Sequence, residues 1–186
     1  MRPSMLKISA ALVIASASLA AHAVDGTVTI TGTVTATTCT VSVNGGPASN
    51  LVTLPTIGAS ALAGSGAVAG ATAFSIGVSG CNTSQAKMVP YFEAAGSSTF
   101  NQGRLATGVS GVDIQILTST GGIVDLSGSA AISGSQTGQG VPLVTLNGTN
   151  PSKSATSNFV ARYYSNAASV GTGAVSVALA YTITYQ

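Results

Sequence analysis

Two stretches of the chain, one near each end, alternate strictly between apolar and polar positions. In residues 27–37 every odd position is threonine, and the even positions are Val, Ile, Gly or Ala. In residues 175–185 the odd positions are apolar or aromatic, and the even positions are small or polar. An alternation with a period of two is typical of a β-strand that buries one of its faces. Both stretches are therefore predicted to be strands, and each needs a partner for its apolar face.

Between these stretches the chain consists of short apolar runs separated by Gly, Ser, Asn and Pro. Residues 58–70 are a low-complexity Ala/Gly/Ser stretch, for which a surface loop and a loose turn of helix both remain open. No segment keeps a helical apolar period for long, and this spacing of short strands predicts an all-β fold of the β-sandwich type. The runs expected to form strands are 74–78, 89–94, 112–116, 123–126, 143–146 and 159–164.

Residues 1–23 have the three parts of a secretory signal peptide. Two basic residues come first, residues 8–21 are almost wholly apolar or small, and Ala-His-Ala at 21–23 supplies the cleavage site. The apolar run is too short to cross a membrane core of roughly 30 Å. We expect export with cleavage after residue 23, and either Met1 or Met5 could be the start.

Charged residues make up only 5% of the chain, where soluble domains average roughly 25%. This scarcity excludes a nucleic-acid binder that neutralises phosphates with Lys and Arg, and a disordered polyelectrolyte. After removal of residues 1–23 no histidine remains, and basic and acidic residues balance to zero net charge. A small neutral domain does not repel its copies, so self-association is expected. The charged residues that remain are Lys87, Arg104, Lys153, Arg162, Asp25, Glu93, Asp113 and Asp125.

The chain contains two cysteines, Cys39 and Cys81. In an exported chain one disulfide is the expected state, and two buried free thiols are the alternative. For a loop of this length the chain-entropy model gives about 4 kcal/mol of stabilisation.

Motifs for catalysis are weak. Residues 84–87 match S-x-x-K, but the S-D-N and K-T-G motifs that accompany it are absent, so a loop is predicted there. Residues 64–69 fit the dinucleotide fingerprint only loosely. Without a mature histidine there is neither a Ser/His/Asp triad nor a histidine ligand for zinc. Asp113 and Asp125 could form a carboxylate pair, but we expect them on solvated faces or in turns. We predict no enzyme, no cofactor and no metal.

Several segments occur in an order and spacing that together are specific, although each is weak alone. With the signal peptide, they resemble the type 1-like fimbrial major subunits, or pilins, of the bacterial chaperone–usher pathway. Gly173, which is fourteenth from the end, and the penultimate Tyr185 look like the chaperone-recognition motif of that family. The segments that carry the resemblance are 26–34, 38–41, 74–81, 111–117, 159–164 and 181–186.

The resemblance implies an incomplete immunoglobulin-like β-sandwich that lacks its last strand. It divides the chain into a signal peptide (1–23), an N-terminal donor-strand extension (24–38) and a pilin domain (39–186). A periplasmic chaperone would fill the groove left by the missing strand, and the extension of the next subunit would then replace it at an outer-membrane usher. The product would be a fimbrial rod on the cell surface, used in adhesion.

From the residues alone, the N-terminal strand could be the first strand of its own sandwich or could pair with another molecule. The resemblance favours the second interpretation and implies which side chains insert, with Gly32 at a position that must stay small. The inserted positions are Val28, Ile30, Gly32, Val34 and Ala36. The strand that the chaperone and the next subunit would contact contains Gly173, Val175, Val177, Leu179, Tyr181, Ile183 and Tyr185.

Two alternatives to a major rod subunit remain open. One is a minor, adaptor or tip subunit, and the other is a carbohydrate-binding adhesin domain. Sugar sites commonly use exposed Trp or Tyr, and this chain has no Trp.

Overall fold

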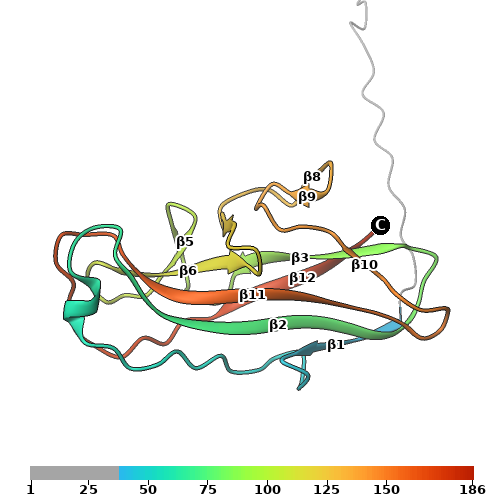
Figure 1. Cartoon of the computed structure of the whole chain (residues 1–186), viewed down its shortest axis with the longest axis horizontal. Helices are drawn as coiled ribbons and strands as arrows, with labels where there is room; N and C mark the ends of the chain where they lie inside the picture. The colour runs from blue at the N-terminus through green and yellow to red at the C-terminus, as the bar shows by residue number, and fades with distance from the viewer. Residues whose placement is uncertain (1–37) are drawn as a thin grey trace, which may run out of the picture. The chain divides into compact units, whose positions relative to one another are not determined.

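The structure is a computed structural model, and it describes residues 38–186. This part of the chain folds into antiparallel strands with one short 3-10 helix, η1 (Figure 1). The elements are β1 (Thr38–Val43), η1 (Ala59–Leu62), β2 (Val68–Asn82), β3 (Lys87–Ala94), β4 (Phe100–Asn101), β5 (Arg104–Ala106), β6 (Val112–Thr118), β7 (Ile123–Val124), β8 (Ile132–Ser133), β9 (Gln136–Thr137), β10 (Val144–Thr145), β11 (Lys153–Ser165) and β12 (Leu179–Tyr185).

The strands form two main sheets and a small hairpin. The larger sheet has the order β1-β2-β11-β6-β5-β4, with β7 also paired to β6. The smaller sheet has the order β10-β3-β12, and β8 pairs with β9 in the hairpin. The long strands β2 and β11 pair antiparallel and run side by side through the larger sheet (Figure 1). The predicted all-β class is therefore confirmed.

The apolar faces of the two main sheets meet in the core. Ile114 and Ile116 of β6 and Phe159 of β11 are buried on the inner side of the larger sheet. The ring of Phe159 stacks on Phe74 of β2, with 5.3 Å between centroids, and meets Phe92 of β3 edge-on at 5.1 Å. Because alternate residues of each strand point inward, this contact across two sheets is the sandwich arrangement that the period-two pattern predicts.

A disulfide links Cys39 of β1 to Cys81 of β2, as the cysteine count predicts. The β1–β2 register shifts between Thr38 and Thr40, at the cysteine. Since β1 is at the edge of its sheet and pairs only with β2 among the described strands, the disulfide holds this edge strand covalently.

The C-terminal strand is shorter than the prediction of 175–185. β12 begins at Leu179, which pairs with Ala94, the last residue of β3. Residues 175–178 have no described strand opposite them, and among them only the Ala178 amide has a hydrogen-bond partner, the Ser98 hydroxyl at 3.2 Å. Val175 and Val177 are still half-buried. The alternation therefore predicts correctly which side chains are buried, but it overestimates the length of the paired strand.

The low-complexity stretch 58–70 contains a short helix and a loop, which were the two predicted possibilities, and also the start of a strand. Its first residues form η1, loop residues follow, and β2 already begins at Val68. The predicted strand 74–78 is the central part of β2, which extends further at both ends, and the predicted strand 159–164 is the second half of β11, which begins earlier, at Lys153.

Candidate functional site

The outer edge of β12 has no strand beside it in the described part of the chain. Gln186 and Lys87 exchange both backbone hydrogen bonds, at 2.8 and 2.6 Å, and the β12–β3 register continues from this pair without a shift. In an antiparallel ladder, bonded and non-bonded pairs alternate. The backbone N–H and C=O groups of the odd residues of β12 therefore point away from β3. These residues are Leu179, Tyr181, Ile183 and Tyr185.

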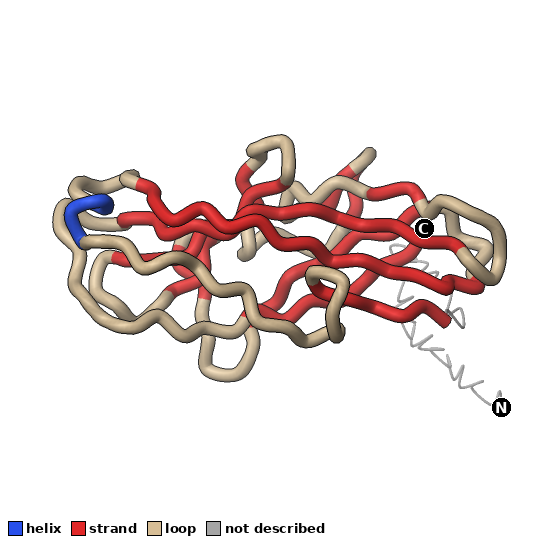
Figure 2. Tube along the Cα trace, turned by 60° about the horizontal axis from the view of Figure 1, so that its bottom comes forward, coloured by secondary structure: helices blue, strands red, loops and turns tan. Residues whose placement is uncertain are grey.

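The opposite wall is formed by β1 and by the loop that follows it. After a turn at 44–47, this loop runs back along the sandwich towards η1 and is drawn as loop throughout (Figure 2). The Tyr181 hydroxyl donates to the Ala48 carbonyl at 2.7 Å, and the Asn50 side-chain amide donates to the Val43 carbonyl at 3.1 Å. The Tyr181 contact bridges β12 and the loop.

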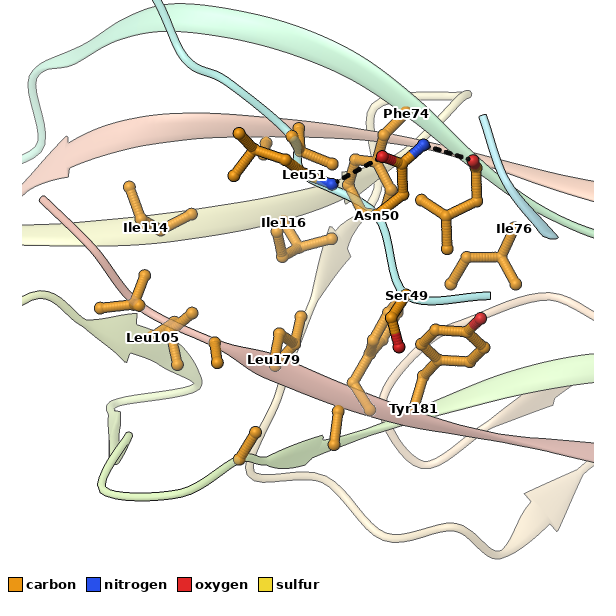
Figure 3. Close-up of a pocket in the computed structure, with 18 of the residues that line it drawn as sticks. Ser49, Asn50, Leu51, Phe74, Ile76, Leu105, Ile114, Ile116, Leu179 and Tyr181 are labelled. Atoms are coloured by element: carbon orange, nitrogen blue, oxygen red, sulfur yellow. Dashed lines mark hydrogen bonds between the residues drawn. The ribbon is translucent and has the colours of Figure 1, made fainter. Parts of the chain in front are cut away.

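Between these walls lies a groove of about 1120 Å³. Its floor consists of core residues of the larger sheet, including Phe74, Ile76, Ile114 and Ile116 (Figure 3). Leu179 and Tyr181 project into it from β12, and Leu105 lies at one end (Figure 3). No charged residue lines the groove in the described part of the chain. It is therefore an elongated opening into the hydrophobic core, bordered by a free strand edge.

A second cavity of about 400 Å³ shares Val175 and Tyr163 with the groove. It is lined by residues before and within η1, by Val109 and Val112, and by Gly173. A Cβ on Gly173 would meet only the Val109 side chain at 3.4 Å, an ordinary contact. The apolar opening thus continues beyond the start of β12.

The structure brings together all of the C-terminal residues that the sequence analysis singled out. Val175, Val177, Leu179, Tyr181, Ile183 and Tyr185 line the groove, and Gly173 lines the second cavity. Their predicted role in contacting a chaperone stays a prediction. The predicted signal peptide and donor positions Val28, Ile30, Gly32, Val34 and Ala36 lie outside the described residues. Thr38, the last residue of the predicted extension, opens β1.

Two tyrosines of the groove have shifted acidities. Partial burial raises the pKa of Tyr181 and of Tyr185 above the ordinary value for tyrosine. Both hydroxyls therefore stay neutral near pH 7, and the groove keeps its uncharged lining.

The expectation that Asp113 lies on a solvated face is wrong. Asp113 lies on β6 and is only 2% exposed, and its Oδ2 accepts hydrogen bonds from Asn101 at 3.0 Å, Asn166 at 2.8 Å and Arg104 at 3.3 Å. Asp125 is exposed and accepts from the Ser127 amide and hydroxyl, which is the turn role expected. The two carboxyl groups thus have separate structural partners.

Sequence reasoning missed the loop wall and one buried amide. Residues 48–54 line the groove, and the half-buried Val52 and Leu54 before Pro55 were an available signal. Gln139 is 1% exposed and bonded to the backbone of β3, but no local pattern marks it. Its position depends on a long-range contact.

Comparison with known proteins identifies the class to which this fold and groove belong. Residues 54–186 match the family model described as Type-1 fimbrial protein, A. The chain is 37% identical over 178 residues to the major fimbrial subunit SMF-1 of Stenotrophomonas maltophilia (strain K279a), covering 93% of this chain and 99% of that protein. It is 34% identical over 181 residues to the F17 fimbrial protein of Escherichia coli, covering 92% and 93%.

A solved structure shows the same fold. The crystal structure of the P pilus rod subunit PapA superposes with a TM-score of 0.55 at 17% identity, covering 79% of this chain and 99% of that chain. The chain therefore belongs to the type-1 fimbrial protein family, and it is a structural pilus subunit with the immunoglobulin-like fold of chaperone–usher pilins. The relatives give no better support to a minor subunit, a tip subunit or a sugar-binding domain.

Subunits of this family polymerise with related subunits into pili on the cell surface. Across residues 38–186, no helix has both the length and the apolar character needed to span a membrane.

Proposed function

We propose that this chain polymerises by donor-strand exchange, in which the groove accepts residues 24–37 of the next subunit, since Thr38 already pairs within its own β1. The observation that carries the proposal is the uncharged groove of about 1120 Å³ beside the free edge of β12. An extended segment placed there would pair with the backbone of β12 and bury its apolar side chains against the core floor. Strand addition to an open sheet edge is a general mode of peptide recognition, and the handling of pilins by their chaperones is one of its known examples.

The predicted extension fits this groove in charge and in length. After Asp25 it carries no charged residue up to Thr38, which matches the uncharged lining. Its apolar positions from 28 to 36 would span about 27 Å as a strand, within the roughly 33 Å over which residues 175–185 extend. The side chains proposed to insert are Val28, Ile30, Val34 and Ala36, with Gly32 between them.

The proposal includes a route for export. A periplasmic chaperone would first occupy the groove, because an exported subunit with an open core would otherwise aggregate or be degraded. An outer-membrane usher would then exchange the chaperone for the extension of the next subunit. The rod would reach the cell surface without covalent chemistry, so the proposal assigns the chain no catalytic role and no cofactor.

Deleting residues 24–37 tests whether this segment is a donor. The truncated chain, co-produced with its chaperone, should be recovered folded because none of its own core is missing. It should bind a synthetic peptide of residues 24–37 but fail to form polymers, measured by native gel electrophoresis and electron microscopy.

A matched peptide controls for nonspecific association. Replacing Val28 and Val34 by Thr keeps the shape of both side chains but puts hydroxyls where methyl groups should be buried. This peptide should bind far more weakly than the original. A truncated chain that cannot be recovered with its chaperone, or that binds both peptides equally, would show that residues 24–37 are not a donor strand.

A further inference from the structure

The smaller sheet has two edges, and they differ in whether a strand can be added. The β12 edge is open, as described above. β3 is the central strand of this sheet. The same alternation of bonded and non-bonded pairs therefore determines which residues of β3 have backbone groups that face its other edge. On β3 the backbone groups of Met88, Pro90, Phe92 and Ala94 point away from β12. Each of the first three has a different reason for not accepting a strand.

At Met88 the edge is covered by β10, because Val144 pairs with Met88. At Pro90 there is no backbone N–H to donate, which is a common way to protect a sheet edge. At Phe92 a side chain replaces a strand: the Phe92 N–H donates to Gln139 Oε1 at 2.9 Å, and Gln139 Nε2 donates to the Phe92 carbonyl at 2.7 Å. The Gln139 amide thus makes the two bonds that a neighbouring strand would make.

Gln139 also holds the segment that covers this edge. Residues 125–141, here called the arm, include the β8–β9 hairpin, which lies beside β3 (Figure 1). Gln139 Nε2 donates a second bond to the Leu126 carbonyl at 3.1 Å, which ties the two ends of the arm together. Among hydrogen bonds of the described residues, only those of Gln139 with Phe92 and a 3.5 Å bond from the Tyr91 hydroxyl to Gly128 join the arm to β3.

The arm also packs too closely against itself for larger residues. A Cβ on Gly128 would overlap the Gly138 carbonyl oxygen, and a Cβ on Gly138 would lie 2.8 Å from the Ser129 carbonyl oxygen. The backbone at residues 138–139 therefore packs tightly against residues 128–129, which holds Gln139 where its amide meets Phe92.

We propose that Gln139 is a specificity residue for assembly: it latches the arm over the β3 edge and so confines strand addition to β12. The inference rests on the proposed donor-strand exchange and explains why a subunit with an exposed core accepts a donor at one edge only. Without the latch, the Phe92 N–H and C=O would lose their partners, and this part of the edge, beyond the positions that β10 and Pro90 protect, would be available to a second copy of the extension, so that rods would branch or associate laterally.

The test compares polymers of the mature chain carrying Gln139→Met with wild-type polymers. Methionine keeps the length and approximate volume of glutamine but makes neither bond to Phe92. The matched control is Gln136→Met, on the same arm, where the side chain is exposed. Fluorescent peptide of residues 24–37 is added to each polymer, and bound peptide per subunit is measured.

Wild-type and Gln136→Met polymers should bind peptide only at chain ends, so bound peptide per subunit falls as rods lengthen. Gln139→Met polymers should bind peptide along their length, in proportion to subunit number. Amide hydrogen exchange at Phe92 should be faster by about tenfold or more in Gln139→Met, since a buried pair of backbone groups has lost its partner. Binding at ends only, together with unchanged exchange at Phe92, would overturn the proposal.

Two outcomes separate this inference from the function on which it rests. If chains that keep Gln139 but lack residues 24–37 still polymerise, donor-strand exchange itself is wrong. If Gln139→Met is not recovered, Gln139→Asn withdraws the amide by one methylene and gives the same readouts. Loss of both variants would assign Gln139 to folding and overturn its role in edge selection.

Discussion

In a chain with so few charges, the structure places most of its cations opposite carbonyl oxygens. Lys153 Nζ donates to the carbonyls of Thr83 and Gln85, both at 3.0 Å, and so fixes the loop between β2 and β3. Arg162 donates to the Gln115 side-chain oxygen at 2.9 and 2.7 Å. Within residues 38–186 the Arg104–Asp113 contact is the one ion pair, at 3.3 Å. In residues 38–186 every buried side-chain nitrogen and oxygen has a hydrogen-bond partner, which a mainly apolar sandwich requires.

Asp113→Ala should destabilise the subunit by about 3–5 kcal/mol, because it leaves a nearly buried Arg104 and two amide donors without their acceptor. The measurement is urea unfolding of the subunit complemented with donor peptide. Asp125→Ala is the control, since its carboxylate bonds only to nearby Ser127 on the surface. Equal losses for the two variants would show that the Asp113 cluster has no special role.

At the scale of elements, the sequence predicts those strands whose burial follows a simple alternation. The odd residues of 175–185 line the groove because a period of two puts them all on one face. The start of β12 at Leu179 could not be read from the same pattern, since it depends on where β3 ends, at Ala94. The loop wall at 48–54 was missed for a similar reason: only Val52 and Leu54 in it are half-buried, and it pairs with no described strand.

The alternation of apolar and polar residues also did not predict which polar side chains are buried. Asp113 and Gln139 are local exceptions whose partners lie far along the chain, at Asn166 and Phe92. An aspartate in a strand is more often solvated, and only the tertiary structure shows that three donors surround this one. The sequence therefore predicts the groove strand well and the residues that fix the surrounding edges poorly.

Ile183→Asn should stop capture of the subunit by its chaperone, because it puts an amide on the apolar face of β12 where a partner strand must pack. Thr182→Asn, one residue earlier, changes the exposed face of the same strand and should be tolerated. The measurement is the amount of subunit that co-purifies with the chaperone from cells producing both. Equal recovery of the two variants would mean that the groove face of β12 is not the contact surface.

At the scale of the whole molecule, the chain lacks the usual ways of staying monomeric. Without the predicted signal peptide the sequence has no net charge, the core is open along a groove, and the edge of β12 is free among the described strands. The other edges are short, covered or face the same groove: β4 is only two residues long, the β3 edge is covered by β10, Pro90 and Gln139, and β1 lies in the opposite wall of the groove. A single groove bordered by the open edges of a neutral subunit favours linear assembly over unordered aggregation.

Gly32→Val separates donor-strand exchange from ordinary burial of the N-terminal strand. In a strand that simply packs in a core, valine should help, because it has a higher β-propensity than glycine and buries more apolar area. If Gly32 instead enters a groove that leaves no room for a side chain there, valine should slow or stop polymerisation while leaving the subunit–chaperone complex intact. The control is Thr31→Val, which makes a side chain of similar size more apolar on the opposite face of the same strand. Polymerisation of purified subunit–chaperone complexes, followed by light scattering, should fall sharply for Gly32→Val and change little for Thr31→Val. Polymerisation of Gly32→Val at the wild-type rate or faster would refute the steric requirement and leave Gly32 without a specific role in assembly.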